Sequence, residues 1–543
     1  MKLRIARRRD AFNAAGLFLF ALALRVSLAD LTQFDGLYGQ DAFAYYDYAR
    51  RLLDSSSRLH MPAPFVWPLG YPALAALAFL PLGISPQAGQ WISMIGGALV
   101  APLVYLLTRN VSNAISGRRA VNAPSNASRA GALLAGLVAA VSGQLLQSSI
   151  VLMADAAATL WATLSALALL RYAKDLRLRW WLTAALSLML AAFTRWVFGA
   201  LLVPWALVFL ILWRKSAGET SSRLRRAATH AIVVLVCALP FCIAQWGALV
   251  PSTSLNHAWL AAWNPANAFR HIFDNPDGHF DYPLPVGVFY AQPLVHPYYI
   301  FPLLLPLILC GLWAVRRAPL PHQIVVLGWP LAVYIFLAGI PYENFRFGLA
   351  LWPPLVVLAG AGLDWIWSRL SEQMEASKDN FGNATAKPPG EIGVRLTPGW
   401  VRWARPTIGA AVALSLLGML LWSARGILPF ITVKNEQRAI VRAVAAQTPA
   451  NGTVVALGLS GYFETYAEDV TVAELYTETP DSLLRLVCAA SPAYLLIEPR
   501  SISEQWANRE PDLNVRWLQA HAGLREIARY DTLVLYQIGG ACA

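Results

Sequence analysis

The chain alternates long apolar stretches with short polar connections. Because a helix needs about 20 apolar residues to cross the hydrocarbon core of a bilayer, such stretches predict membrane-spanning helices. The candidate spans are residues 11–29, 88–107, 130–149, 155–172, 180–194, 196–213, 229–248, 298–315, 322–340, 348–367 and 407–424. A shorter apolar piece, 69–83, contains Pro72 and Pro81 and predicts a re-entrant or interfacial segment. The pattern indicates a polytopic α-helical membrane protein with about 11 to 12 transmembrane helices.

Basic residues gather in alternate connections, which predicts the direction in which each helix crosses. Arg7, Arg8 and Arg9 precede the first span, and further basic clusters follow the second, fourth, sixth and eighth spans. The other connections, including 30–68 and 249–297, are poor in Lys and Arg. The positive-inside rule therefore predicts a cytoplasmic N-terminus and places these other connections on the exoplasmic side. The first 30 residues also resemble a signal peptide, but the polytopic chain that follows favours an uncleaved first helix.

Residues 180–213 allow two interpretations, one long tilted helix or two short crossings that meet near Arg195. A single crossing would leave one of the two flanking basic clusters on the exoplasmic side, whereas two crossings keep both in the cytoplasm. We therefore expect two crossings, with Arg195 at the exoplasmic side.

The chain changes character towards its C-terminus. Residues 368–404 are polar and rich in Gly and Pro, which is typical of a linker, here expected in the cytoplasm. Residues 433–543 combine a helical period with short apolar runs, TVVALGL, AYLLIEP and LVLYQI, which predict strands. We expect residues 1–432 to form the membrane domain and 433–543 a soluble α/β domain on the exoplasmic, or periplasmic, face.

Composition supports this assignment and excludes one class of function. The chain is 57% hydrophobic and only 14% charged, whereas about a quarter of a soluble protein is charged. The net charge of +12 could indicate nucleic-acid binding, but the basic residues sit in short clusters between apolar runs, so we expect no nucleic-acid partner. The five cysteines show no disulfide framework or zinc spacing, and pairing of Cys488 with Cys542 stays open.

The first outer loop contains the stretch DAFAYYDYARRLLDS, which begins at Asp41. Its alanines, leucines and two of its tyrosines recur at helical spacing, and Asp47 and Arg51 fall on the opposite side, so the stretch predicts an amphipathic interfacial helix. Asp41 has two interpretations. It is either a helix cap that accepts amide hydrogen bonds or a carboxylate with a chemical role.

Three further charged residues stand at the predicted outer ends of spans: Asp155, Arg195 and Arg346. Each has a structural explanation, because Asp155 could cap a helix, Arg195 could snorkel, and Glu343 could neutralise Arg346. In the functional alternative, the arginines bind a phosphate and a carboxylate deprotonates a hydroxyl or holds a metal. Two acids and two arginines at one outer face suggest transfer from a phosphorylated lipid donor.

Three motifs in this order carry a resemblance to a known family: GQDAFAYYDYARRLL with WPLGYPALAALAFLPLG, then MADAAATLWATLSALALL, then ENFRFGLALWPPLVVLAGAGL. Together they resemble the polytopic GT-C glycosyltransferases, in particular the bacterial relatives of the protein O-mannosyltransferases and the aminoarabinose–lipid A transferases. The resemblance extends over about residues 10–370 in motif order and topology.

The resemblance implies a sugar donor linked to a polyprenyl phosphate, such as undecaprenyl phosphate, and an acceptor hydroxyl on a glycolipid, polysaccharide or protein. It implies that Asp41 is the general base in an inverting transfer and that Asp155 is the second acid. Arg346 would bind the lipid phosphate with help from Arg195. Many relatives carry paired acids in the first loop, whereas Gln40 precedes Asp41 here. This departure leaves open how the acids share their roles and whether a divalent metal ion takes part.

Polar and aromatic residues of the outer loops are candidates for substrate binding: Tyr45, His60, His296, Tyr298, Tyr342 and Glu343. The loop 249–297 also contains DNPDGHFDY, whose acids and histidine could hold a metal. Its Asn-Pro and Asp-Gly pairs specify turns more simply, and the spacing matches no standard metal site.

Two other functions are considered. A transporter or lipid flippase would also place charges in a membrane protein, but such folds show internal repeats, and none is evident here. In the other, the C-terminal domain is the functional part and the helices are its anchor. That domain has no glycine-rich phosphate loop, and we expect it to select or position the acceptor. The sequence therefore favours an inner-membrane glycosyltransferase.

Overall fold

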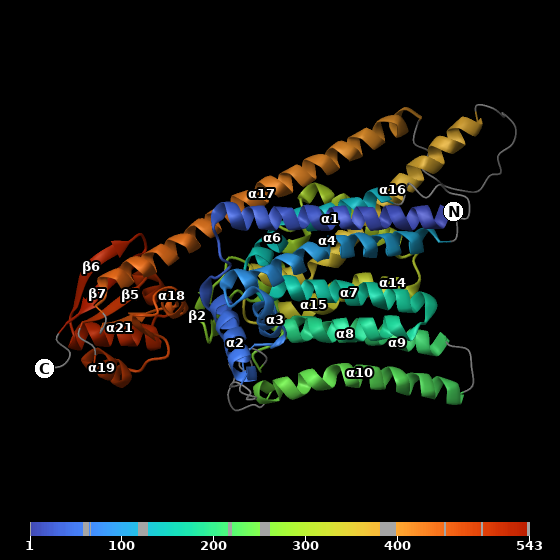
Figure 1. Ribbon diagram of the computed structural model, residues 1–543. Helices are drawn as coiled ribbons and strands as arrows, with labels where there is room; N and C mark the ends of the chain where they lie inside the picture. The colour runs from blue at the N-terminus through green and yellow to red at the C-terminus, as the bar shows by residue number, and fades with distance from the viewer. Residues whose placement is uncertain are drawn as a thin grey trace.

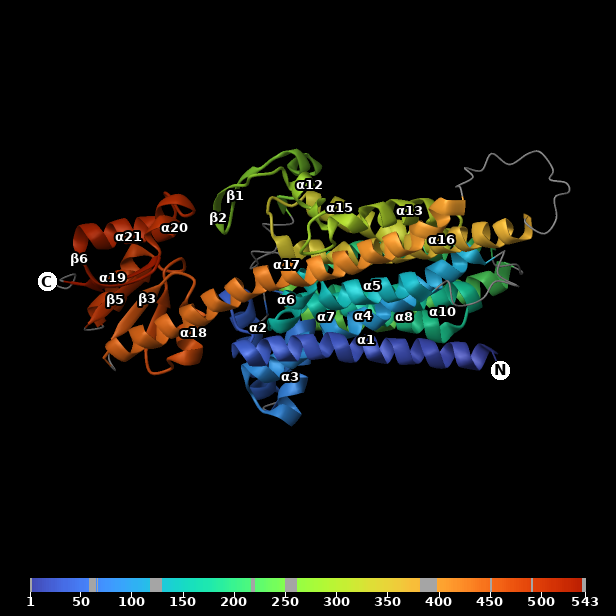
Figure 2. The ribbon, with the colours of Figure 1, turned by 90° about the horizontal axis from the view of Figure 1, so that it is seen from above.

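The structure is a computed structural model that describes residues 2–57, 65, 67–117, 129–215, 220–249, 261–380, 398–449, 452–489 and 492–539. A long bundle of helices forms most of the molecule (Figure 1). A smaller domain with a β-sheet lies beyond the end of the bundle that is opposite to the N-terminus (Figure 2). The expected fold class, a polytopic helical protein with a C-terminal α/β domain, is confirmed.

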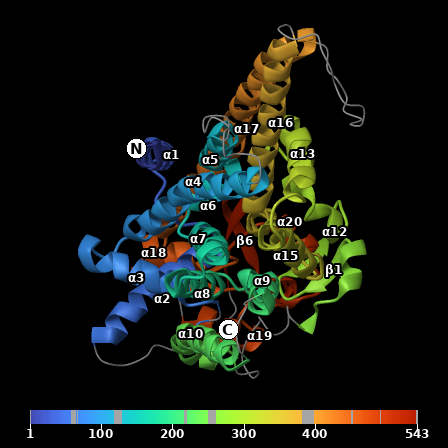
Figure 3. The same ribbon diagram turned by 90° about the vertical axis from the view of Figure 1, so that its right-hand side faces the viewer.

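Helices lie in all eleven expected spans, although the span 298–315 is helical only from Pro302 onwards. The bundle helices are α1 (Lys2–Thr32), α4 (Pro86–Ser116), α5 (Ala130–Val141), α6 (Gly143–Ile150), α7 (Ala154–Asp175), α8 (Leu178–Thr194), α9 (Leu202–Lys215), α10 (Thr220–Leu249), α13 (Leu305–Val315), α14 (Leu320–Gln323), α15 (Trp329–Ala338), α16 (Trp352–Asn380) and α17 (Pro398–Gln447). Seen along the bundle, α7 lies inside, whereas α1 and α10 lie at the periphery (Figure 3).

Length and composition identify the helices that can cross a membrane. Within the described chain, six helical segments are long and apolar enough on their own, and the bent pair α5–α6 makes a seventh. The other apolar helices are shorter: Gly70–Leu82, Leu178–Thr194, Ala228–Ile243 and Pro302–Val315. The chain is thus a multi-pass membrane protein, and the expected count of about 11 to 12 includes these shorter helices.

Small residues bring the bundle helices into close contact. A Cβ atom on Gly131 of α5 would lie 1.9 Å from the carbonyl oxygen of Gly360 in α16. A Cβ atom on Gly311 of α13 would lie 2.0 Å from the carbonyl oxygen of Leu358. Within a bilayer, where helices associate through packing, such contacts between backbones fix their relative positions.

The expected span 130–149 is not one straight helix, since α5 and α6 meet at an angle of 48°. The bend frees carbonyl groups at the end of α5, and the fully buried Arg25 binds one of them, the oxygen of Ala140, at 3.4 Å. On the other side of the bend, the carbonyl oxygen of Tyr298 accepts hydrogen bonds from Gln144 N at 3.0 Å and Ser142 Oγ at 3.3 Å. These contacts replace the backbone bonds that the bend removes.

Residues 180–213 form two helices, α8 and α9, as expected. They are joined by the 3₁₀ helix η2 (Trp196–Leu201), and Arg195 is the C-terminal cap of α8 with an extended backbone. The chain therefore turns at the residue where positive-inside reasoning placed the turn.

The segment between α1 and α4 contains α2 (Gly39–Ser57), followed by α3 (Gly70–Leu82). On the apolar face of α2, Tyr45 and Tyr46 are buried, and the aromatic rings of Tyr71 in α3 and of Trp67 pack against Tyr45. This face of the expected interfacial helix is therefore covered by protein. The short helix α3 leaves several large apolar side chains exposed, namely Leu77, Leu80 and Leu82.

The segment between α10 and α13 contains a hairpin. Strand β1 (Ile272–Asn275) pairs antiparallel with β2 (Gly278–Asp281), and the Asn-Pro-Asp-Gly sequence forms the turn, as predicted. The short helices around the hairpin and the later loops are η3 (Pro265–Phe269), α12 (Val286–Phe289), η4 (Gln292–Leu294), η5 (Pro302–Leu304), the π-helical η6 (Ile324–Gly328) and η7 (Phe345–Ala350).

The expected linker 368–404 is helical at both ends, in α16 and α17, and residues 381–397 lie outside the described residues. Helix α17 passes without a break through residue 433, the expected domain boundary. It leads from the bundle into the C-terminal domain, so one continuous helix joins the two (Figure 1).

The C-terminal domain is built on a five-stranded sheet with the order β4-β3-β5-β7-β6. The strands are β3 (Thr453–Ala456), β4 (Thr471–Glu474), β5 (Ala493–Ile497), β6 (Leu524–Tyr530) and β7 (Leu533–Ile538), and the helices are α18 (Ser460–Tyr466), α19 (Pro480–Ala489), α20 (Pro499–Glu504) and α21 (Glu510–His521). Strands β3, β4 and β5 are parallel, and β7 is antiparallel to both of its neighbours. The three apolar runs expected as strands form β3, β5 and β7. Cys488 is disulfide-bonded, and Cys542 lies outside the described residues.

Candidate active site

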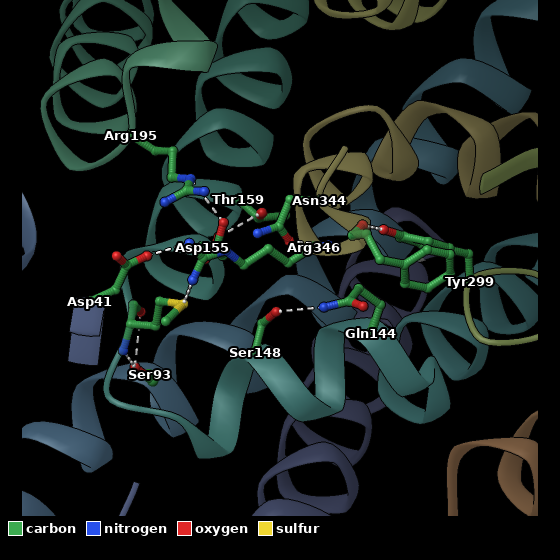
Figure 4. A network of polar contacts seen from close by, with 12 residues as sticks. Asp41, Ser93, Gln144, Ser148, Asp155, Thr159, Arg195, Tyr299, Asn344 and Arg346 are labelled. Atoms are coloured by element: carbon green, nitrogen blue, oxygen red, sulfur yellow. Dashed lines mark hydrogen bonds and ion pairs between the residues drawn. The ribbon is translucent and has the colours of Figure 1, made fainter. Parts of the chain in front are cut away.

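Four charged residues from four elements meet at the end of the bundle that faces the C-terminal domain (Figure 4). Asp41 lies in the first turn of α2 and Asp155 in the first turn of α7. Arg195 ends α8, and Arg346 lies in η7. The structure therefore brings together the four residues that the sequence analysis grouped.

Asp41 forms an ion pair with Arg346 through its Oδ2 atom and the Nη2 atom of the arginine. The side chains are 24% and 16% exposed, so the pair remains accessible to solvent. Helix α2 begins at Gly39, and the Asp41 carboxylate binds the arginine, so the cap interpretation does not describe its contact. The alternative partner of Arg346, Glu343, does not form this pair; its buried Oε1 has no hydrogen-bond partner in the described chain.

Local structure fixes the position of Arg346. The side chain of Asn344 caps η7 by accepting a hydrogen bond from the backbone amide of Arg346 at 3.2 Å. The Nη1 atom of Arg346 lies 2.6 Å from the sulfur of Met153, which precedes α7. Tyr38 also forms a side-chain hydrogen bond with Arg346. Together these contacts direct the guanidinium group towards the ends of α2 and α7.

Asp155 forms the second pair, with 2.9 Å between its Oδ1 atom and Nε of Arg195. This carboxylate is only 5% exposed, and the Arg195 side chain is 15% exposed. The cap position of α7 belongs to Met153, so Asp155 is not the cap either. Its other oxygen, Oδ2, is buried and has no hydrogen-bond partner among the residues described. Because isolated carboxylates are costly to bury, this oxygen can accept one further donor.

The ring of Phe347 links the two pairs. The guanidinium carbons of Arg195 and Arg346 lie 4.7 Å and 5.6 Å from the centre of this ring, within range of cation–π attraction. Phe347 directly follows Arg346 in the sequence, so the same turn of η7 provides an arginine for one pair and a surface for the other.

Tyr38, Met153 and Phe347 are site residues that sequence reasoning missed. Met153 and Phe347 lie within the quoted motifs and Tyr38 directly precedes one, so all three lie within three residues of Asp41, Asp155 or Arg346. Burial raises the pKa of Tyr38, so its hydroxyl keeps its proton at neutral pH. Proximity to the lone charges in sequence was the only signal that could have identified them.

The six candidate substrate-binding residues separate into three groups. Tyr45 is 2% exposed and lies within electrostatic range of all four charged residues, and burial raises the pKa of its hydroxyl. His60 lies outside the described residues. The other four line the segments on either side of η7 and α13, and are described next: His296, Tyr298, Tyr342 and Glu343.

His296 and Tyr298 are held by the protein. The hydroxyl of Tyr298 donates to Gln147 Oε1 at 2.5 Å, and its ring packs over Gly143 at the bend of α5 and α6. The His296 ring packs against Phe345, with 4.7 Å between ring centres, and burial lowers the pKa of the imidazole. His296 is therefore neutral at physiological pH.

Tyr342 and Glu343 precede η7. The carbonyl oxygen of Tyr342 accepts a hydrogen bond from the hydroxyl of Tyr290 at 2.9 Å. Burial raises the pKa of Glu343 to about 7, so half of this carboxyl is protonated near neutrality. Both residues lie close to the site in sequence, and neither forms an ion pair with its arginines in the described chain.

No group of three or more His, Cys, Asp or Glu side chains in the described chain is arranged to hold a metal ion. In the DNPDGHFDY hairpin, the histidines form two separate pairs: His279 lies 3.0 Å from Asp274, and His271 lies 3.1 Å from Asp281. Each acid of the four-residue site is already paired with an arginine. Among the residues that the structure describes, no donor set is therefore arranged for a divalent metal ion.

Neither a protein-family model nor a curated relative matches the sequence. Solved structures are similar in fold. The structure of ArnT from Cupriavidus metallidurans in the apo state has a TM-score of 0.56 at 14% sequence identity, over 95% of this chain and 97% of that chain. ArnT from the same organism bound to undecaprenyl phosphate has the same score at 16% identity, over 96% of this chain and 98% of that one.

A third similar structure is the oligosaccharyltransferase of Archaeoglobus fulgidus in complex with Zn and sulfate. It has a TM-score of 0.50 at 13% identity, over 96% of this chain and 73% of that chain. Because these identities are low, the similarity concerns the fold. The chain has the GT-C fold, the fold of polytopic glycosyltransferases, as its motifs predicted.

Proposed function

We propose that this protein is an integral-membrane glycosyltransferase that moves a sugar from a polyprenyl phosphate, such as undecaprenyl phosphate, to an acceptor hydroxyl. The observation that carries the proposal is the meeting of two carboxylates and two arginines at one end of a GT-C bundle. The undecaprenyl phosphate bound to the similar ArnT structure supports the class of donor. The acceptor is a glycolipid, a polysaccharide or a protein.

In the proposed reaction, Asp41 accepts the proton of the acceptor hydroxyl. The acceptor oxygen then bonds to the anomeric carbon, and the bond from that carbon to the phosphate oxygen breaks with inversion. The electron pair of this bond goes to the lipid phosphate, and Arg346 stabilises the charge that develops there. Arg195 assists by electrostatic attraction, and Asp155 orients Arg195 and a sugar hydroxyl.

The ion pair of Asp41 with Arg346 gives this mechanism an order. Arginine binds phosphate through two parallel hydrogen bonds, so the lipid phosphate competes with the Asp41 carboxylate for the same donors. Donor binding therefore releases the Asp41 carboxylate from its arginine, so that its oxygens are free to accept the proton of the acceptor hydroxyl. We infer that the donor binds before Asp41 becomes an effective base.

The remaining candidate residues are proposed to surround the substrates. Tyr45, Tyr342 and Glu343 would contact the sugar, and His296 and Tyr298 would contact the lipid side, with His60 from the first outer loop. For the residues that the structure describes, these assignments follow from their places beside α2 and η7, and His60 is retained from its position in the sequence of the first outer loop.

We propose a location in the bacterial inner membrane, with the N-terminus in the cytoplasm and the C-terminal domain in the periplasm. The disulfide at Cys488 supports this orientation, because disulfides persist in oxidising compartments. The site and the C-terminal domain share one end of the bundle (Figure 1), so the same orientation places the reaction on the exoplasmic face.

The test is transfer by the purified protein in lipid nanodiscs supplied with undecaprenyl-phosphate-linked sugars and envelope acceptors. Formation of a glycosylated acceptor together with free undecaprenyl phosphate is expected. In proteoliposomes, movement of labelled lipid-linked sugar between leaflets without any transfer would instead favour a flippase. Failure of both reactions with every donor would refute the proposed function.

A further inference from the structure

The C-terminal domain contacts α2 with the loop before it, and the β1–β2 hairpin, which is bonded to the segment before Arg346. One contact reaches α2, which carries Asp41, and the other reaches the β1–β2 hairpin, which supports the segment before Arg346. Figure 1 shows α18 beside α2, and Figure 2 shows the hairpin reaching from the bundle towards α20 and α21.

The first contact is centred on the buried Asp35, in the loop before α2. The Asp35 side chain is 8% exposed, and the residue lies six positions before Asp41. Its Oδ2 atom accepts a hydrogen bond from the hydroxyl of Tyr466 in α18 at 2.6 Å. The same oxygen pairs with Arg438 of α17 at 3.0 Å. The Oδ1 atom of Asp35 accepts from the amide of Leu37 at 3.2 Å, so the loop that starts α2 is held in one conformation.

Aromatic packing extends this contact into α2 itself. The ring of Phe43, two residues after Asp41, lies 4.5 Å from the ring of Tyr462 in α18. A Cβ atom on Gly461 would lie 2.7 Å from the side chain of Phe43, so only glycine allows α18 to approach so closely. The residues on both sides of Asp41 in the sequence are thus fixed by the C-terminal domain.

The contact with the hairpin is formed by polar groups around α20 and α21. Arg509 donates to the carbonyl oxygen of Asn275 at 2.5 Å and pairs with Asp274 at 3.1 Å. The side-chain amide of Gln505 donates to the backbone carbonyl oxygen of Asp277 at 2.7 Å. The backbone carbonyl oxygen of Gln505 accepts a hydrogen bond from the backbone amide of His279 at 2.9 Å. The tip of the hairpin is therefore bonded to the domain on both strands.

The hairpin passes this constraint to Arg346. The side chain of Asn275 donates to the backbone carbonyl oxygen of Pro341 at 3.2 Å. The hydroxyl of Tyr290 donates to the backbone carbonyl oxygen of Tyr342 at 2.9 Å. Two residues later, Asn344 caps η7 and orients the amide of Arg346. A continuous series of bonds leads from Arg509 to the arginine of the site.

We propose that the C-terminal domain is a clamp that sets the separation of α2 and η7, and with it the distance between the Asp41 carboxylate and the phosphate held by Arg346. Arg509 and Tyr466 are positioning residues in this clamp. The expected effect on kcat rests on the proposed transfer reaction. The expected effect on the separation of α2 and η7 does not depend on any activity. Since a displacement of about 1 Å can cost about a hundredfold in rate, loosening the clamp lowers kcat.

The test compares Arg509→Ala and Tyr466→Phe with the control Arg500→Ala. Arg500 lies in the neighbouring helix α20, and among the described residues its side chain pairs with Glu504 at the surface, so its loss leaves the hairpin bonds intact. We expect kcat to fall about tenfold or more for Arg509→Ala, by less for Tyr466→Phe and not at all for the control. Arg509→Lys, which keeps the charge but has a single donor nitrogen in place of the two that bind Asn275 and Asp274, restores part of the rate.

Spin labels give a readout that is independent of transfer. Arg51 on α2 and Ile272 on β1 are exposed and accept labels as cysteines after the free cysteines are replaced. The distance between the labels is expected to broaden in Arg509→Ala and to stay narrow in Arg500→Ala. An unchanged distance in Arg509→Ala overturns the clamp, even if kcat falls. If the unaltered protein transfers no sugar, the proposed function is refuted. The distance between the two spin labels still shows whether the C-terminal domain acts as a clamp.

Discussion

Asp41 and Arg346 join a loop helix to a turn in another loop, whereas Asp155 and Arg195 join two neighbouring bundle helices, α7 and α8. The first carboxylate is 24% exposed and the second only 5%. Separation of the buried pair would leave charges in a low dielectric without compensation. The two arginines are about equally exposed, so the pairs differ in their carboxylates, and the more accessible Asp41 carboxylate can exchange its partner at lower cost.

This difference assigns the two pairs different tasks. A pair that must release its arginine to a substrate phosphate has to be accessible, and the Asp41–Arg346 pair is accessible. A pair that shapes the site has to persist, and the buried Asp155–Arg195 pair meets this requirement. Four predictions examine this contrast, from the largest expected effect to the smallest.

Arg346→Ala is expected to lower kcat/KM for lipid-linked sugar by about a thousandfold, because it removes the group that stabilises the leaving phosphate. Arg346→Lys keeps the charge but not the paired donors, so its loss should be intermediate. Steady-state transfer assays measure both variants. Equal activity of Arg346→Ala and the unaltered enzyme would remove Arg346 from the mechanism.

Asp155→Asn is expected to destabilise the protein by about 3 kcal/mol, because Arg195 loses its buried counter-charge. Asp41→Asn should cost about 1 kcal/mol or less, since its pair is more exposed. Thermal unfolding in the same detergent compares the two variants. Similar losses in both would contradict the division into a fixed and an exchangeable pair.

Asp41→Asn is expected to bind undecaprenyl phosphate about tenfold more tightly than the unaltered protein, because the competing carboxylate charge is gone. Asp155→Asn should show no such gain. Ligand-induced stabilisation measures both affinities without turnover. Weaker binding by Asp41→Asn would show that the phosphate does not compete with this carboxylate.

Glu343 gives the smallest effect, a change of stability with pH. Burial raises its pKa from 4.5 to about 7, so the folded state binds the proton more tightly than the unfolded state. The stabilisation is complete below about pH 4.5 and is lost as the pH rises to about 7. Glu343→Gln should flatten this part of the profile of melting temperature against pH, and an unchanged profile would refute the assignment.

Much of the fold could be predicted because hydropathy and positional charge are local signals. All eleven spans, the turn at Arg195 and three strands of the C-terminal sheet follow from apolar period and basic clusters. The bend between α5 and α6 could not be predicted, since it depends on Tyr298 packing over Gly143 from a distant segment. The continuity of α17 was missed because its polar second half reads as a separate helix.

The four charged residues could be found because a lone charge in an apolar context is conspicuous. The pairing of these residues could not be predicted, because Glu343 is nearer than Asp41 to Arg346 in the sequence. The same limit applies to Asp35, Asn275 and Arg509. Their roles arise from contacts between segments hundreds of residues apart, which no local pattern records.

The most direct test of the account is single-turnover transfer by Asp41→Asn with saturating lipid-linked sugar, beside Asp47→Asn as control. Asp47 lies on the same helix and pairs with Arg51 at the surface. The account predicts that Asp41→Asn binds donor but transfers sugar about a thousandfold more slowly, as expected for loss of a general base. Asp47→Asn should react at the normal rate. Unimpaired transfer by Asp41→Asn would contradict the central claim.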